Sequence, residues 1–128
     1  MPGVVDVVRA LQARGMTLAI TSSAVRSSIE TILTRLGLRD AFALFVDGSE
    51  VTHGKPDPEA YLVTARKLGA MPEECVVIED SHVGVVAAKR AGMYCIAVRN
   101  PNAQIVQDLS AADVIVGSMR ELGPARGS

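Results

Sequence analysis

The segment that most constrains the fold runs from Val76 to Gly92 and reads VVIEDSHVGVVAAKRAG. Three β-branched residues at its start suit a short buried strand, and two adjacent carboxylates, Glu79 and Asp80, follow them. Apolar residues then recur at the spacing of an amphipathic helix, at Val83, Val86, Ala87 and Ala91. A strand that ends in acids and leads into a helix places those acids at the carboxyl edge of a parallel sheet, where open α/β folds bind ligands.

The acid pair itself has two interpretations. Neighbouring carboxylates repel each other, so a site of this kind commonly holds a hard cation such as Mg²⁺. Alternatively, the pair belongs to an acidic loop in which Ser81 caps the following helix. The residues of this segment alone leave both interpretations open.

Composition and charge narrow the class of protein. A chain of 128 residues is long enough for one domain, and its 48% apolar but only 3% aromatic content predicts an aliphatic core. The net charge of −1 and the lack of long basic runs disfavour a nucleic-acid partner. No apolar run approaches the roughly 20 residues of a membrane helix, and the first residues do not resemble a signal peptide. Cys75 and Cys95 adjoin apolar strand runs and are expected to be reduced, so we expect a cytoplasmic protein without membrane partners.

Predicted strands and helices alternate along the chain. Strands are expected at 17–20, 43–46, 76–78, 94–98 and 113–116. Five helices are expected: one between Gly3 and Gly15, one that ends at Gly37, one from Pro58 to Lys67 or Leu68, one after Ser81, and one from Ala103 to Leu109. In the second helix, the side chains expected to be buried are Val25, Ile29, Ile32, Leu33 and Leu36. This alternation predicts βαβ units, hence an α/β fold with a parallel sheet and helices on both faces.

Candidate functional groups follow three of these strands. The Ser22 hydroxyl and the Ser23 backbone N–H, at the start of a helix, are suited to phosphate oxygens. Lys55 could balance a phosphoryl group and the nearby carboxylates, while Glu79 and Asp80 would hold Mg²⁺. Each residue alone has an ordinary role, such as a helix cap or a surface lysine. Their ordered occurrence at strand ends favours a functional site.

Three segments resemble the second, third and fourth motifs of the haloacid dehalogenase-like superfamily: LAITSS, HGKPDPEAYL and VVIEDSHVGVVAAKRAG. Their spacing and flanking residues are similar to the phosphoglycolate phosphatase and β-phosphoglucomutase branch, from about Gly3 to Leu122. The resemblance implies a Rossmann-like three-layer sandwich with a mostly parallel sheet. It also implies Mg²⁺ as cofactor and a small phosphate ester or sugar phosphate as substrate.

The same resemblance implies a role for each candidate residue. Ser22 matches the phosphate-binding hydroxyl, with Ser23 beside it. Lys55 matches the charge-balancing lysine, which contacts the phosphoryl group during catalysis. Asp80 matches the metal ligand, and Glu79 supports it.

One family feature does not occur in the sequence. The family's nucleophile and its general acid/base form an Asp-x-Asp motif after an N-terminal strand, whereas the aspartates here stand at 6, 40, 47, 57, 80, 108 and 113. We therefore expect residues 1–122 to be a core domain without the first strand and cap, followed by a flexible tail at 123–128, and inactive by itself. A non-catalytic domain that binds phosphate or Mg²⁺ is the alternative. A receiver-type signalling domain is disfavoured, because receivers place their acids after the first strand and their lysine late.

The resemblance also predicts a gap in the sheet. The family's first strand lies between the strand that ends at Thr21 and the strand that ends at Ile78. Unpaired backbone groups on both strands would each cost roughly 1–3 kcal/mol if they were buried without a partner. We expect association to supply those partners, as a homo-oligomer or through a strand donated by another chain. Direct pairing of the two strands, or an unstable protein, are the alternatives.

Overall fold

The computed structural model describes residues 3–22, 26–100 and 106–117. The chain divides into two compact units, one made of Met1–Glu50 with Ser118–Ser128 and one made of Val51–Gly117. Each unit contains its own parallel β-ladder and its own hydrophobic core. The expected flexible tail at 123–128 lies outside the described residues.

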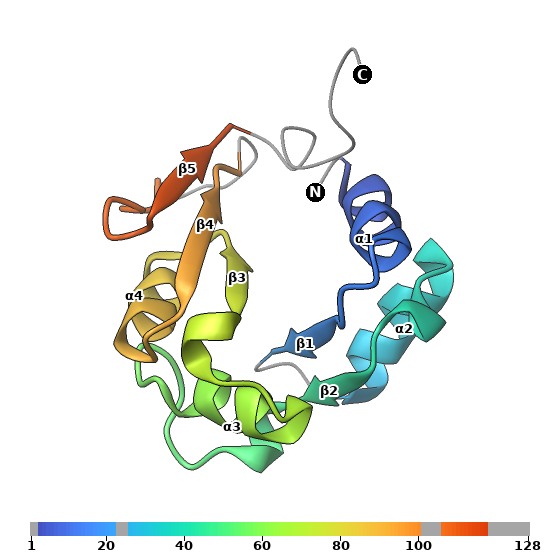
Figure 1. Cartoon of the computed structure of the whole chain (residues 1–128), viewed down its shortest axis with the longest axis horizontal. Coiled ribbons are helices and arrows are strands. Elements are labelled where there is room, and N and C mark those ends of the chain that lie inside the picture. The colour runs from blue at the N-terminus through green and yellow to red at the C-terminus, as the bar shows by residue number, and fades with distance from the viewer. Residues whose placement is uncertain (1–2, 23–25, 101–105, 118–128) are drawn as a thin grey trace. The chain divides into compact units, whose positions relative to one another are not determined.

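In the first unit two short strands pair with each other, and two helices pack with them (Figure 1). Its elements are α1 (Val4–Ala13), β1 (Ala19–Thr21), α2 (Arg26–Leu36) and β2 (Leu44–Val46). β1 and β2 run parallel, with Ala19 opposite Leu44 and Thr21 opposite Val46. Five buried side chains of this unit form a hydrophobic cluster, which consists of Val8, Ile29, Leu33, Leu38 and Ala41. A 3-10 turn at Gly48–Glu50 follows β2.

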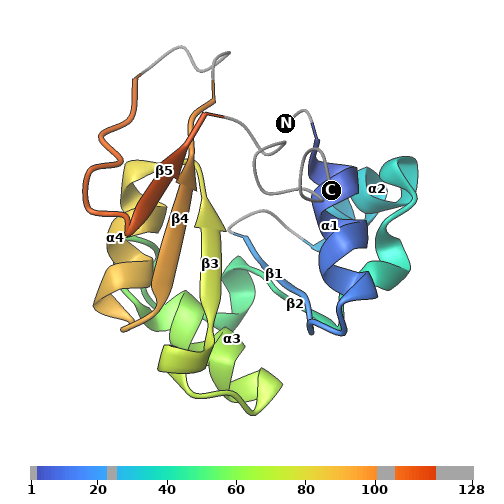
Figure 2. The same ribbon diagram turned by 45° about the horizontal axis from the view of Figure 1, so that its top comes forward.

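The second unit contains a three-stranded parallel sheet with the strand order β3-β4-β5, drawn side by side in Figure 2. Its elements are α3 (Glu59–Leu68), β3 (Val76–Glu79), α4 (His82–Arg90), β4 (Tyr94–Val98) and β5 (Val114–Val116). Alternate residues of the strands pack with α3 and α4 in one core, which includes Val77, Cys95, Ala97, Val85, Ala87, Ala88 and Tyr61. Small side chains on α4 allow the helix to approach the sheet closely.

The prediction of an α/β fold with parallel strands is confirmed, since the three strand pairs formed by the described residues are all parallel. The predicted strand at 94–98 matches β4, and the predicted strand at 17–20 is shifted to Ala19–Thr21. Gly69 ends α3 in the left-handed conformation, with φ 69°. Just before α3, the carboxylate of Asp57 accepts the backbone N–H of Glu59 at 2.9 Å.

Two predicted helix faces are wrong in part. Ile32 and Leu36 on α2 are 58% and 41% exposed, because only the stripe through Ile29 and Leu33 reaches the core of the first unit. On α4, Val83 is 42% exposed, whereas Val85 is fully buried. α4 turns Val85, Ala87 and Ala88 into the core, and its Gly84 faces the side chain of Glu79.

The helix predicted at Ala103–Leu109 is not present at residues 106–109. Residues 101–105 lie outside the described residues. The segment instead serves the start of α4: Gln107 Oε1 accepts the backbone N–H of His82 at 2.9 Å, and the carbonyl of Asp108 lies 2.8 Å from His82 Nδ1. Leu109 is buried in the core of the second unit.

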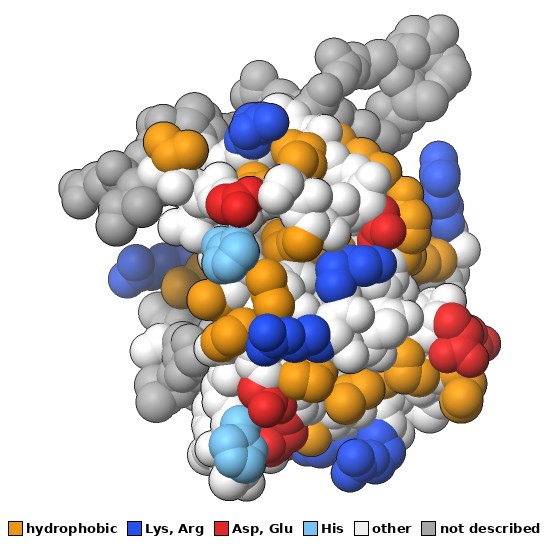
Figure 3. Space-filling view, turned by 90° about the vertical axis from the view of Figure 1, so that its left-hand side faces the viewer, with side chains coloured by type: hydrophobic (Ala, Val, Ile, Leu, Met, Phe, Trp, Pro, Cys, Tyr) orange, Lys and Arg blue, Asp and Glu red, His pale blue; other side chains and the backbone are white. Residues whose placement is uncertain are grey.

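Charges are mixed on the face drawn in Figure 3, where Lys and Arg side chains alternate with acidic and hydrophobic ones and form no continuous basic surface. Among the described residues, none of the helices has the length and apolar character required to cross a membrane.

Candidate functional site

The carboxyl end of β3 carries the acid pair and leads directly into α4. Glu79 is the last residue of the strand, and α4 begins at His82. Between them, the hydroxyl of Ser81 accepts the backbone N–H of Gly84 at 3.1 Å, so Ser81 caps the helix. The helix-cap interpretation of Ser81 is therefore confirmed, and it coexists with a charged cluster built on Glu79.

Both carboxylate oxygens of Glu79 accept hydrogen bonds within the protein. Oε1 accepts the backbone N–H groups of Asp80 and Ser81, at 3.1 and 3.3 Å, and the Ser81 hydroxyl at 3.1 Å. Oε2 accepts the Lys55 ammonium at 3.1 Å and the Tyr61 hydroxyl at 2.6 Å. These five donors hold the carboxylate of Glu79 in one position.

The electrostatics of Glu79 favour its charged form. Burial by itself raises the pKa of Glu79, but the positive charge of Lys55 and the hydrogen bonds from Tyr61, Lys55 and the Asp80 N–H outweigh it. The pKa of Glu79 therefore lies below its usual value. Conversely, burial and the charge of Glu79 raise the pKa of Tyr61 far above its usual value, so Tyr61 stays protonated and donates.

Asp80 has the opposite electrostatic character. Burial, and then the negative charge of Glu79, raise the pKa of Asp80 above its usual value. Lys55 lowers it by a smaller amount. Within the described residues no basic side chain forms an ion pair with Asp80. A carboxylate destabilised by burial and by a like charge gains most from a nearby cation.

The loop before α3 positions Lys55. The carboxylate of Glu59 accepts the backbone N–H of Thr52, and it accepts the backbone N–H of His53 and contacts His53 Nδ1 at 3.1 Å each. The N–H of Asp57 donates to the carbonyl of Gly54 at 3.0 Å, which closes the turn around Lys55. His53 therefore helps to fix the loop.

The remaining predicted residues belong to the first unit. Ser22 follows β1, and its backbone N–H donates to the carbonyl of Val46 at 2.9 Å. Ser23 lies outside the described residues. The structure thus brings Lys55 and Glu79 together beside Asp80 in the second unit, and it places Ser22 at a strand end in the first.

Sequence reasoning did not identify Tyr61 and Gly84 as parts of this cluster. A Cβ atom on Gly84 would lie 2.0 Å from Cδ of Glu79, so no larger residue fits while Glu79 keeps its position. Tyr61 stands inside the PEAYL segment, but its letter alone does not indicate that the hydroxyl reaches a carboxylate 18 residues away. A signal for Gly84 was present, because a glycine in the first turn of a helix commonly marks a close approach.

Several curated proteins with related sequences are named as phosphatases. The chain is 36% identical to hexitol phosphatase B of Escherichia coli over 122 residues, which cover 95% of this chain and 55% of the relative. It is 43% identical to the phosphorylated carbohydrates phosphatase of Thermotoga maritima over 93 residues, which cover 72% of this chain and 43% of the relative. The chain spans about half the length of the curated relatives it matches.

Solved structures share the fold. CbbY from Rhodobacter sphaeroides, crystallised in complex with phosphate, superimposes with a TM-score of 0.86 at 30% identity, covering 95% of this chain and 55% of that one. A putative β-phosphoglucomutase from Thermotoga maritima gives a TM-score of 0.85 at 35% identity, covering 95% of this chain and 57% of that one. These similarities confirm the Rossmann-like fold. A family model described as haloacid dehalogenase-like hydrolase matches residues 1–92, and the chain therefore belongs to the haloacid dehalogenase-like hydrolases.

Proposed function

We propose that this chain is the phosphate- and Mg²⁺-binding core of a phosphatase-type enzyme that acts on a small phosphorylated metabolite. The observation that carries the proposal is the ion pair between Lys55 and Glu79, 3.1 Å long, beside Asp80 at the carboxyl end of β3. The curated relatives whose names specify hexitol or carbohydrate phosphates support a sugar phosphate as the substrate class.

In this proposal each candidate residue keeps the role that the family resemblance implies. Lys55 binds the phosphoryl oxygens and balances their charge. Ser22 supplies a hydroxyl to the phosphate, with Ser23 beside it. Asp80 is the metal ligand, and Glu79 supports it from a position in which both of its oxygens already accept hydrogen bonds.

The donor chemistry fits Mg²⁺ in part. Hard divalent cations prefer carboxylate oxygens. Burial and then the charge of Glu79 raise the pKa of Asp80, so a nearby cation would stabilise its charged form. No group of three or more His, Cys, Asp or Glu that could hold a metal occurs within the described residues. Bound Mg²⁺ would neutralise phosphate charge. We expect its binding to be weak and to depend on Asp80.

Phosphate binding tests the proposal directly. Calorimetric titration of inorganic phosphate in the presence of Mg²⁺ should give a measurable affinity for the 128-residue chain. The Lys55→Met variant should lose at least about tenfold in affinity, because a hydrogen-bonded charge is removed. Lys67→Met, on the exposed side of α3, is the matched control and should bind like the wild type. Equal affinities for all three proteins would contradict the proposal.

We propose further that these 128 residues alone do not turn over phosphate esters. The sequence contains no Asp-x-Asp pair, so the covalent step and its general acid lack their usual residues. The chain should show no Mg²⁺-dependent hydrolysis of a generic aryl phosphate. Turnover that disappears in Lys55→Ala would mean that another residue acts as nucleophile.

The second candidate function is a non-catalytic binding domain completed by association. Among the described residues β3 pairs with β4 on one side, and its other edge forms no strand ladder. An added strand, from a second copy or from another chain, would satisfy this edge. Sedimentation should then detect an oligomer. A monomer that melts cooperatively without any added fragment would contradict association.

A reducing compartment is part of the proposal. Cys75 and Cys95 are both free thiols, and burial raises the pKa of the Cys95 thiol to about 11. Free, protonated thiols are typical of cytoplasmic proteins, so we propose a cytoplasmic location.

A further inference from the structure

Tyr61 contacts both partners of the ion pair on which the proposed function depends. Its hydroxyl donates to Oε2 of Glu79 at 2.6 Å, and Lys55 Nζ lies 4.8 Å from the centroid of its ring. The same oxygen of Glu79 accepts Lys55 Nζ at 3.1 Å. One aromatic side chain therefore touches the ammonium through its ring and the carboxylate through its hydroxyl.

The rest of Glu79 is fixed from the opposite side. Its Oε1 is held by the backbone and hydroxyl of Ser81, and its side chain lies against Gly84, where a Cβ would come within 2.0 Å. On the other side of the carboxylate, the donors to Oε2 among the described residues are Tyr61 and Lys55. Tyr61 comes from α3 and is buried in the core, whereas Lys55 comes from the loop before α3.

Burial separates Tyr61 from an ordinary surface hydrogen bond. Tyr61 is only 6% exposed and belongs to the core cluster of the second unit with Ala65, Val85 and Cys95. Packing in that core restricts its ring to one orientation. An aromatic residue that only filled the core would need no hydroxyl, whereas the Tyr61 hydroxyl donates a hydrogen bond to the charged carboxylate of Glu79.

We propose that Tyr61 is a positioning residue that holds Lys55 and Glu79 as one fixed unit and thereby presents the Lys55 ammonium to phosphate. The inference deepens the proposed function and rests on it for the identity of the ligand. The geometry of the fixed unit is independent of the proposed function, since the fixed ammonium can be observed without any ligand.

The fixed ammonium should be visible by NMR of the lysine side chains. The sequence has three lysines, Lys55, Lys67 and Lys89, so assignment is simple. An ammonium held by hydrogen bonds exchanges its protons with water slowly and gives a ¹H–¹⁵N signal at mildly acidic pH. Lys89, which is bonded to Asp113 at 2.7 Å and to the Met93 carbonyl, provides an internal reference. The ammonium signal that disappears in the Lys55→Met variant is the signal of Lys55.

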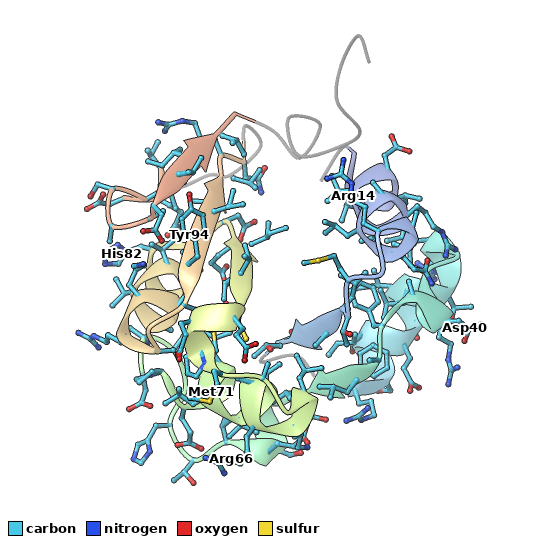
Figure 4. The ribbon with its side chains drawn as sticks, in the orientation of Figure 1. Arg14, Asp40, Arg66, Met71, His82 and Tyr94 are labelled. Atoms are coloured by element: carbon cyan, nitrogen blue, oxygen red, sulfur yellow. The ribbon has the colours of Figure 1, made fainter. Side chains whose placement is uncertain are left out.

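The test compares the same conservative substitution, tyrosine to phenylalanine, at the two tyrosines of the sequence. In Tyr61→Phe, which keeps the ring and removes the hydroxyl, proton exchange at Lys55 should accelerate about tenfold while the Lys89 signal stays unchanged. Affinity for inorganic phosphate with Mg²⁺ should fall about tenfold as well. Tyr94→Phe is the matched control: Tyr94, labelled in Figure 4, is the first residue of β4 and is 45% exposed, so neither quantity should change.

Each outcome has a definite meaning. A Lys55 signal in Tyr61→Phe with wild-type exchange, or a wild-type protein in which Lys89 is visible and Lys55 is not, overturns the inference. A changed Lys55 signal with unchanged phosphate affinity also overturns it. If the wild type shows the slow Lys55 signal but binds no phosphate, the proposed function fails and the fixed unit stands.

A second variant covers the case in which Tyr61→Phe does not fold. Gly84→Ala displaces Glu79 from the other side, because the new Cβ would overlap the carboxyl group. It should abolish the slow Lys55 signal in the same way. An unchanged Lys55 signal in Gly84→Ala would show that Glu79 does not hold the ammonium.

Discussion

Both units of this protein carry one basic and two acidic side chains next to the carboxyl end of a parallel strand, but the two clusters are built differently. In the first unit Arg26 lies 3.8 Å from Asp47 and 3.6 Å from Glu50, and its side chain is 45% exposed. In the second unit Lys55 lies 3.1 Å from Glu79, and both side chains are largely buried. Asp80 is the second acid there.

The partners of the acids show what each cluster does. Asp47 accepts the backbone N–H and the hydroxyl of Ser49, and Glu50 accepts the N–H of Asp47 at 2.8 Å, so these acids close a local turn. Glu79 instead joins segments 18 and 24 residues away. A cation beside two carboxylates therefore does not define a functional site by itself. What distinguishes the second cluster is the burial of its ion pair and the raised pKa of Asp80.

Removal of Glu79 should have the largest effect on stability. Glu79→Ala leaves the buried Tyr61 hydroxyl and the Lys55 ammonium without their shared acceptor, and should lower the free energy of unfolding by about 3 kcal/mol. Glu50→Ala, the matched change in the first unit, should cost about 1 kcal/mol or less. Urea denaturation measures both. Equal losses would mean that the two clusters are equivalent.

Neutralising Asp80 should have a smaller effect of opposite sign. Because burial and the charge of Glu79 raise the pKa of Asp80 in the folded state, wild-type stability falls as pH rises from its usual pKa of 3.8 through the raised value. Asp80→Asn lacks this loss, so its free energy of unfolding relative to the wild type should increase over that pH range and then stay constant. Thermal melts at a series of pH values measure the difference. A pH-independent difference would contradict a raised pKa of Asp80 in the folded state.

Loss of Arg26 should have the smallest effect. Its ion pairs are long and partly exposed, although its guanidinium also lies 5.5 Å from the Phe45 ring centroid and donates to the Phe45 carbonyl at 3.0 Å. Arg26→Gln should therefore reduce the free energy of unfolding by less than about 1 kcal/mol. The reduction should shrink further at high salt, because the pairs are accessible to solvent. A loss as large as that of Glu79→Ala would remove the contrast between the clusters.

The sequence predicted the strands of this fold more reliably than the packing around the site. Short β-branched runs bounded by turn residues favour strands, and the predicted strand at 94–98 has the same bounds as β4. The buried face of α4 was predicted incorrectly at Val83, because periodicity does not reveal that Gly84 must face Glu79. The acid pair and Lys55 were predictable as a set. The role of Tyr61 was not, since it depends on a contact between α3 and β3 that no local pattern encodes.

One measurement tests the distinction between the clusters most directly: a backbone amide NMR titration of the 128-residue chain with Mg²⁺ and inorganic phosphate. We predict that the amides of Glu79–Ser81 and Lys55 shift first and most, that those of Asp47–Glu50 move little, and that Asp80→Asn removes the Mg²⁺-dependent shifts. Shifts of similar size at Asp47–Glu50, or unchanged shifts and apparent affinity in Asp80→Asn, would contradict the assignment of the second unit's cluster as the functional site.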